Sequence, residues 1–178
     1  ITVSVKNASA EYNGGEKTPE LQFTGGNAAQ VTADHYNEIE WKKDNKTVTS
    51  FKDAGTYTGT FTWKEDKTEN GTDSSSLTFM ITPLDLSNAS ISVQANAPIL
   101  DTDIENNNTV KESGKSKILI KRGTLDLKDN NFANDVEFAY TYTSAVGNNP
   151  ASVTAKVTAK GSNVINSKEG SFTVTTDI

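Results

Sequence analysis

Short segments with apolar residues at every second position recur along the whole chain. They include residues 1–5, 57–63, 77–81 and 153–157. A period of two places the apolar side chains on one face of an extended backbone, which indicates half-buried β-strands. Turn residues separate these segments, and the chain is poor in the Leu and Ala that build helices. We therefore predict an all-β fold made of many short strands.

The composition excludes several kinds of site and partner. Of the 178 residues, 23 are acidic and 17 are basic, which gives a net charge of −6. This balance disfavours nucleic acid as a partner, because phosphate neutralisation needs a clustered basic face. The absence of cysteine excludes disulfides, thiolate metal sites and a cysteine nucleophile, and the single histidine, His35, excludes a multi-histidine metal site. No apolar run approaches the roughly 20 residues of a membrane helix, so we expect no membrane insertion.

The second half of the chain repeats the pattern of the first. The matched residues are Val3 and Val5 with Ile91 and Val93, Leu21 and Phe23 with Ile118 and Ile120, Tyr36, Ile39 and Trp41 with Phe132, Val136 and Phe138, Gly55 with Gly147, and Phe79 and Ile81 with Phe172 and Val174. A repeat of this length indicates one structural unit per copy. We place the boundary at Pro83, so the units are residues 1–83 and 84–178. Each has room for about six or seven strands, which predicts two tandem immunoglobulin-like β-sandwiches, the second one diverged.

Three motifs in the first unit carry a resemblance to a known family. They are Tyr12-Asn13-Gly14 with Pro19 after it, Asp53-Ala54-Gly55-Thr56-Tyr57, and Phe79-Met80-Ile81-Thr82-Pro83. This set resembles the bacterial Ig-like repeat domains that stand in tandem on Gram-positive cell-surface proteins and adhesins. The second unit keeps only the back half of the pattern, in residues 146–147, 159–163 and 170–174. The resemblance implies a sandwich fold and an extracellular location, and such repeats serve both as spacers and as binders.

The segment from Asp53 to Tyr57 also resembles the tyrosine corner of Ig-like sandwiches. In that feature the tyrosine hydroxyl bonds back to the backbone a few residues upstream and fixes the crossover between sheets. We therefore expect Tyr57 to have a structural role rather than a ligand-binding one.

No arrangement of residues indicates catalysis. Asp34 and His35 are adjacent, so on a strand their side chains point apart, whereas a Ser-His-Asp catalyst needs a base held beside its nucleophile. Glu38 and Glu40 share one face if that stretch is a strand, but glycosidase chemistry needs two carboxylates set across a cleft. We predict that the chain is not an enzyme and has neither catalytic nor cofactor-binding residues.

Calcium is the one metal for which the sequence offers candidates. Oxygen-bearing side chains gather in residues 101–106, with Asp101 and Asp103, and in residues 126–131, with Asp126 and Asp129. Calcium takes about six to eight oxygen ligands, often from loops. Neither segment fits the EF-hand pattern, and Lys128 intrudes in the second. The favoured prediction is that no metal is bound, with these aspartates as the calcium candidates.

Aromatic rings are the alternative binding groups, because a ring face can stack on the apolar face of a sugar. The candidates are Tyr36, Trp41, Tyr57 and Trp63. Tyr57 and Trp63 share the parity of Phe61, which predicts one common side facing the core. Trp41 likewise shares a face with Ile39. Core packing is therefore the favoured interpretation of these rings.

The sequence favours a structural function. The chain opens on Ile-Thr-Val-Ser-Val without Met or a signal peptide, so we expect a fragment of a longer protein. We predict a non-catalytic spacer or adhesive display module of a bacterial, Gram-positive, cell-surface or secreted protein. Its partners are then a protein or glycan at a cell or matrix surface and the neighbouring repeats of the parent chain. The alternative is a carbohydrate-binding module of a secreted glycan-capture protein or enzyme.

Overall fold

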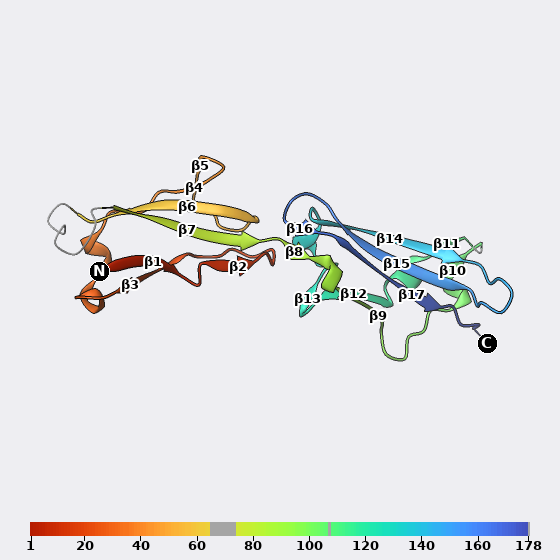
Figure 1. Cartoon of the computed structure of the whole chain (residues 1–178). Helices are drawn as coiled ribbons and strands as arrows, with labels where there is room; N and C mark the ends of the chain where they lie inside the picture. The colour runs from red at the N-terminus through yellow and green to blue at the C-terminus, as the bar shows by residue number, and fades with distance from the viewer. Residues whose placement is uncertain (65–73, 107, 178) are drawn as a thin grey trace. The chain divides into compact units, whose positions relative to one another are not determined.

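The computed structural model describes residues 1–64, 74–106 and 108–177. The described chain is mostly β, with several small sheets and one short α-helix (Figure 1). It divides into two compact units, Ile1–Pro83 and Leu84–Ile178, and this division coincides with the boundary drawn from the repeat. The polar segment expected between the strands ending at residue 63 and beginning at residue 77 lies largely outside the described residues.

The first unit contains two sheets. Strands β1 (Thr2–Lys6) and β3 (Glu20–Thr24) form an antiparallel pair. The other sheet has five strands in the order β2-β7-β6-β4-β5. Their bounds are β2 (Ser9–Glu11), β4 (Trp41–Lys43), β5 (Lys46–Val48), β6 (Gly55–Thr62) and β7 (Ser74–Thr82). β2 runs parallel to β7, and the remaining neighbours are antiparallel.

The connection between β3 and β4 contains two short 3₁₀ helices, η1 (Ala28–Gln30) and η2 (Ala33–His35). β4 and β5 then form a tight hairpin, which the polar run after Trp41 predicts. Asp44 and Asn45 occupy its turn with φ of 53° and 63°. Positive φ at both central residues is the type I′ geometry that matches the twist of paired strands, and Asp and Asn tolerate it.

The core of the first unit follows the period-two pattern. Tyr57, Phe61 and Trp63 are all buried, as the shared parity predicts, and they alternate with exposed or half-buried threonines. Val3 and Val5 of β1 and the alternate residues of β7 are buried as well. The apolar faces of the two sheets therefore pack against each other.

The second unit contains two three-stranded antiparallel sheets and two short strand pairs. The three-stranded sheets have the orders β13-β12-β9 and β14-β15-β17. Their strands are β9 (Ser90–Val93), β12 (Ile118–Arg122), β13 (Leu125–Asp126), β14 (Val136–Thr143), β15 (Ser152–Ala159) and β17 (Ser167–Thr173). The short pairs are parallel β8 (Leu84–Asp85) with β16 (Val164–Ile165) and antiparallel β10 (Ile104–Glu105) with β11 (Thr109–Val110). The 3₁₀ helices η4 (Leu86–Asn88) and η6 (Asn130–Phe132) also belong to this unit.

The described residues 101–106 and 108–114 contain more regular structure than their polar composition suggests. This segment forms the 3₁₀ helix η5 (Asp101–Asp103), the β10–β11 pair and the beginning of α1 (Glu112–Lys115). Ile104 and Val110 lie opposite each other in the pair and are both buried. Ile104 and Val110 thus bring an apolar contact to a segment whose composition is otherwise mostly polar.

The strand pairs at the start of the two units share one register. In each unit the two matched apolar residues of the first strand lie opposite the two of the second. The pairs are Val3 with Phe23 and Val5 with Leu21 in the first unit, and Ile91 with Ile120 and Val93 with Ile118 in the second. The residues matched in the sequence are therefore structural counterparts in these four strands.

The closing strand pairs also share a register, and it corrects two of the sequence matches. The residues lying opposite each other are Tyr57 and Phe79 in the first unit, and Val153 and Phe172 in the second. With these as anchors, the counterpart of Trp41 is Tyr140 and not Phe138, because Tyr140 lies opposite the corresponding position of the neighbouring strand. Gly147 lies in a turn four positions before the counterpart of Gly55. Both errors arise because the segments between the paired strands differ in length: residues 44–54, which include β5, join β4 to β6, whereas residues 144–151 join β14 to β15.

Candidate functional site

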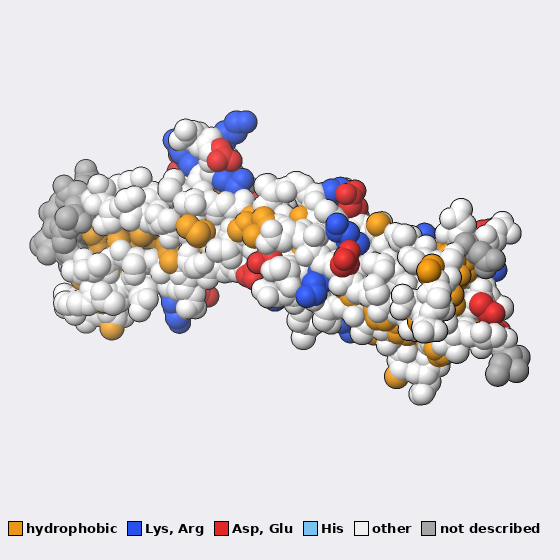
Figure 2. All heavy atoms as spheres, turned by 45° about the vertical axis from the view of Figure 1, so that its right-hand side comes forward, with side chains coloured by type: hydrophobic (Ala, Val, Ile, Leu, Met, Phe, Trp, Pro, Cys, Tyr) orange, Lys and Arg blue, Asp and Glu red, His pale blue; other side chains and the backbone are white. Residues whose placement is uncertain are grey.

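A groove of about 670 Å³ lies in the first unit, between β3 and the segment that leads into β4. Its apolar lining comes from half-buried side chains, and two carboxylates border it. The apolar residues are Leu21, Phe23, Tyr36, Ile39 and Trp41, and the acidic ones are Glu20 and Glu38. Figure 2 shows apolar side chains reaching the surface in a stripe along this unit. The groove therefore offers both apolar surface and negative charge.

The aromatic side of the groove is held by the core. The ring of Phe23 lies 5.6 Å from that of Tyr36 and 5.8 Å from that of Phe61. Tyr36 also forms a β-bridge with Trp63. These contacts fix Phe23 and Tyr36 against buried rings, so the groove wall is pre-formed.

The other side of the groove depends on a close approach at Gly59. Trp41 lies opposite Gly59 in the β4–β6 ladder. A Cβ atom at position 59 would stand 2.8 Å from Cγ2 of Ile39 and 3.1 Å from the Trp41 ring. The glycine thus allows both side chains to lie against β6. The Trp41 ring also packs edge-on against Phe51, with centroids 5.7 Å apart.

The two groove carboxylates make no ion pair within the described part of the chain. Glu20 lies opposite Lys6 across the β1–β3 ladder without reaching ion-pair distance. Glu38 also borders a second, polar hollow together with Glu40, which accepts a hydrogen bond of 2.8 Å from Thr47. The groove therefore carries two exposed carboxylates that form no ion pair within the described residues.

The remaining acid–base candidates of the first unit serve local structure. Nδ1 of His35 accepts a hydrogen bond of 3.0 Å from the backbone N–H of Thr32, which caps η2. Asp34 is exposed beside it. This Nδ1 already has its partner within the turn, so the pair is arranged as a helix cap.

Tyr57 makes the hydrogen bond that the tyrosine corner predicts. Its hydroxyl donates to the carbonyl oxygen of Asp53 over 2.6 Å. Burial raises the pKa of Tyr57 above its ordinary value, and the negative charge of Asp53 adds to the effect. Tyr57 and Trp63 are 1% and 7% exposed, so neither offers a ring face to a ligand. Of the four rings that could stack on a sugar, only Tyr36 and Trp41 therefore remain as candidates.

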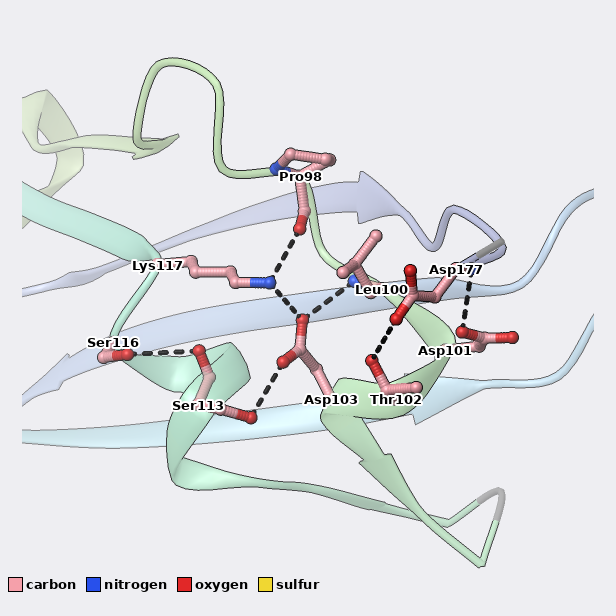
Figure 3. A network of polar contacts seen from close by, with 9 residues as sticks. All are labelled: Pro98, Leu100, Asp101, Thr102, Asp103, Ser113, Ser116, Lys117 and Asp177. Carbon is pink, nitrogen blue, oxygen red and sulfur yellow. Dashed lines mark hydrogen bonds and ion pairs between the residues drawn. The ribbon is translucent and has the colours of Figure 1, made fainter.

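A polar cluster lies in the second unit around a buried carboxylate (Figure 3). Asp103 is 4% exposed, and its Oδ2 lies 2.6 Å from Nζ of Lys117. Oδ2 also accepts from the Leu100 N–H, and Oδ1 accepts from the Ser113 hydroxyl, each over 2.8 Å. Lys117 donates in addition to the Pro98 carbonyl over 3.0 Å. Burial raises the pKa of Asp103, but these hydrogen bonds outweigh burial and hold the pKa below its ordinary value.

The four calcium candidates do not converge in the structure. Asp103 is committed to the polar cluster, and Asp101 accepts a hydrogen bond of 3.0 Å from the N–H of Asp177. Asp126 and Asp129 each accept from the N–H two residues ahead, over 3.0 Å. Among the described residues, no three His, Asp or Glu side chains gather into a group that could hold a metal ion. The aspartates act as local turn and cluster acceptors.

Lys128, which interrupts the second calcium segment, has a role that the sequence does not reveal. Its Nζ donates to the carbonyl oxygens of Lys115 and Ile118, the former over 2.9 Å. Burial lowers the pKa of Lys128, and the charge of Asp126 opposes this shift. The ammonium group thus satisfies carbonyls at the end of α1 and at the edge of β12.

The groove residues Leu21, Phe23 and Glu20 were not singled out from the sequence as a site. The sequence signal for this groove is indirect. A short alternating strand follows Pro19, and no later strand is matched to its outer edge. Among the described residues, no helix is both long and apolar enough to span a membrane.

Comparisons with known proteins place few constraints on the chain. No protein-family model matches it, and no curated protein matches it significantly. Among solved structures, it is similar to the N-terminal part of the bacterial S-layer protein SbsC, with a TM-score of 0.29 and 14% sequence identity. The similarity covers 98% of this chain and 44% of that chain, so the present chain spans less than half of its length.

Proposed function

We propose that the chain is a non-catalytic module of a bacterial cell-surface or secreted protein, made of two tandem Ig-like sandwiches that space and display neighbouring domains. The location follows from the resemblance of the first-unit motifs to surface-protein repeats, and the structural role follows from the architecture. The observation that carries the proposal is the shared register of equivalent strand pairs in two units that each have a core of their own.

The strand order of the first unit supports the Ig-like assignment. The order β7-β6-β4-β5 corresponds to the G-F-C-C′ sheet of such sandwiches, and β1–β3 corresponds to their A–B pair. The hydroxyl of Tyr57 bonds back near the beginning of β6, where the fold places its tyrosine corner. In the second unit, the order β14-β15-β17 corresponds to C-F-G.

Force spectroscopy of the full chain tests the spacer role. The chain is held between two handles, one at each end, and extended. Two tandem sandwiches should give two separate unfolding events per molecule, because each core breaks on its own. A single event, or no resolved event, would remove the architectural basis of the proposal.

An activity screen tests the non-catalytic part. The intact chain is incubated with chromogenic glycosides, esters and peptides, and no turnover above the buffer rate is expected. Turnover that His35→Ala or Glu38→Gln abolishes, while the fold is retained, would show the chain to be an enzyme.

The carbohydrate-binding alternative is favoured by one observation, which is that Tyr36 and Trp41 line the same groove. Acrylamide quenching of tryptophan emission, with and without soluble polysaccharides, tests it. Binding at the groove should protect the emission in the unaltered chain and in a Tyr142→Ala control but not in Trp41→Ala. If every polysaccharide leaves quenching unchanged, the alternative fails.

A further inference from the structure

The outer edge of β3 is open in the first unit. β3 pairs with β1 on one side, and within the described residues no other strand pairs with it. No hydrogen bond from outside this ladder reaches the backbone of Leu21 or Phe23 in the described part of the chain. An unpaired strand edge presents a row of donors and acceptors that an added strand can satisfy.

The second unit shows what occupies the corresponding edge. β12 is the counterpart of β3, and its outer edge pairs with β13. The N–H of Leu127 donates to the Ile120 carbonyl over 3.0 Å, and Lys128 donates to the Ile118 carbonyl. The short strand β13 and the turn residues Leu127 and Lys128 that follow it therefore complete this edge within the chain itself.

The apolar side chains at the two edges differ in their exposure to solvent. Ile118 and Ile120 are 0% exposed, and Leu127 is 1% exposed. Leu21 and Phe23 are the counterparts of these two isoleucines, yet both are only half-buried and line the groove. Within its described residues, the first unit thus has no counterpart of the element that covers this position in the second.

Charge defines the chemistry that suits the open edge. Glu20 and Glu38 border the groove without an ion pair, and no Lys or Arg is present among its described lining residues. A basic segment would compensate both carboxylates, whereas an acidic one would be repelled.

We propose that the edge of β3 and the adjoining groove bind an extended basic segment of a partner protein, which adds to the β1–β3 sheet as a strand. Its apolar side chains enter the groove against Phe23 and Trp41, and its lysines or arginines meet Glu20 and Glu38. This proposal rests on the display function, since it names the chemistry of the partner that the module holds.

The test uses the full ¹⁵N-labelled chain and an end-blocked peptide of alternating leucine and lysine. In two-dimensional NMR, the peptide should shift the amides of Leu21 and Phe23 and the indole of Trp41. The same peptide with glutamate in place of lysine should not bind. A version methylated on alternate backbone nitrogens should lose binding as well, because it cannot donate to the strand edge.

Two matched variants locate the charge. The double variant Glu20→Lys with Glu38→Lys should weaken the peptide affinity at least about tenfold. Glu137→Lys, an exposed single change on β14, should leave the affinity within about twofold. The double variant Glu20→Gln with Glu38→Gln should fall between these limits, and it keeps the test decisive if charge reversal disturbs the fold.

Several results would overturn the proposal. They are no shift at β3 up to about 1 mM peptide, equal binding of the acidic or methylated peptide, and shifts confined to other surfaces. If a polysaccharide shifts these residues and the peptide does not, the groove is a glycan site. A failure here would leave the two unfolding events intact, so it is distinguishable from a failure of the display function.

Discussion

The two units build equivalent strand pairs around different interiors. In the first, aromatic rings join the two sheets: the ring of Phe23 on β3 lies 5.8 Å from that of Phe61 and 6.0 Å from that of Trp63, measured between centroids. In the second, aliphatic side chains such as Ile118 and Ile120 fill the core. A period-two pattern of apolar residues determines how the strands pair, whereas the shape of the core depends on which side chains occupy the inward-facing positions.

The interior of the second unit also contains polar groups. Asp103 and Lys117 form an ion pair there, and Lys128 covers carbonyls at a strand edge. The first unit has no such pair in its described residues, since its ion pairs are between exposed or half-buried side chains. The second unit should therefore respond to charge and pH more than the first.

Both tryptophans, Trp41 and Trp63, lie in the first unit, so tryptophan emission reports that unit alone.

The largest expected effect comes from breaking the aromatic core. Phe61 is 0% exposed, and Phe61→Ala should cost about 4 kcal/mol through lost burial and a cavity. Denaturant unfolding followed by tryptophan emission should shift to a much lower midpoint. The matched change in the second unit, Val157→Ala, should leave that emission midpoint unchanged. Equal shifts from both variants would contradict separate cores.

The next effect comes from removing one partner of the buried ion pair. Lys117→Met leaves the Asp103 carboxylate without its cation and should destabilise the second unit by roughly 2 kcal/mol. Far-UV circular dichroism should show an earlier transition that tryptophan emission does not follow. Adding Asp103→Leu to this variant should restore part of the loss, because the uncompensated charge is then gone. An unchanged second-unit transition would show that the pair is dispensable.

A smaller effect is expected at the tyrosine corner. Tyr57→Phe removes one hydrogen bond, to the carbonyl of Asp53, and should cost about 1 kcal/mol in the first unit. The tryptophan-detected midpoint measures it. Tyr142→Phe, a half-buried control in the second unit, should leave that midpoint in place.

The smallest effect is the response to acid. The pKa of Asp103 lies below its ordinary value in the folded chain, so the unfolded chain binds its proton first as the pH falls. The stability that Asp103 contributes is present above its unfolded pKa, about 3.9, and is lost as the pH falls through the folded pKa. In thermal melts, the unfolding midpoint of the second unit should fall as the pH is lowered below about 4. In the variant Asp103→Asn, this midpoint should depend less steeply on pH. A steeper dependence in that variant would contradict the assignment.

Local pattern predicted the strands, the β4–β5 turn and the Tyr57 hydrogen bond, because each depends on residues close in sequence. It did not predict that Asp103 meets Lys117 or that Lys128 reaches the Ile118 carbonyl, because these contacts require the folded chain. It also missed the groove, since the exposure of Leu21 and Phe23 depends on whether another strand lies along the outer edge of β3, and the described residues of the first unit supply none. Alternation shows which side of a strand faces inward, but not whether its edge has a neighbour.

The parallel strand pairs set the order in which each unit can form. In the first unit, Ser9 lies opposite Met80, and in the second, Leu84 lies opposite Val164. Contacts of such long sequence separation close late in folding. A chain that emerges from a ribosome or a translocation pore therefore cannot complete a unit until nearly all residues of that unit have passed through. Limited proteolysis of chains truncated before residue 80 should find the first unit unprotected, so its folding is tied to the end of its own synthesis or export.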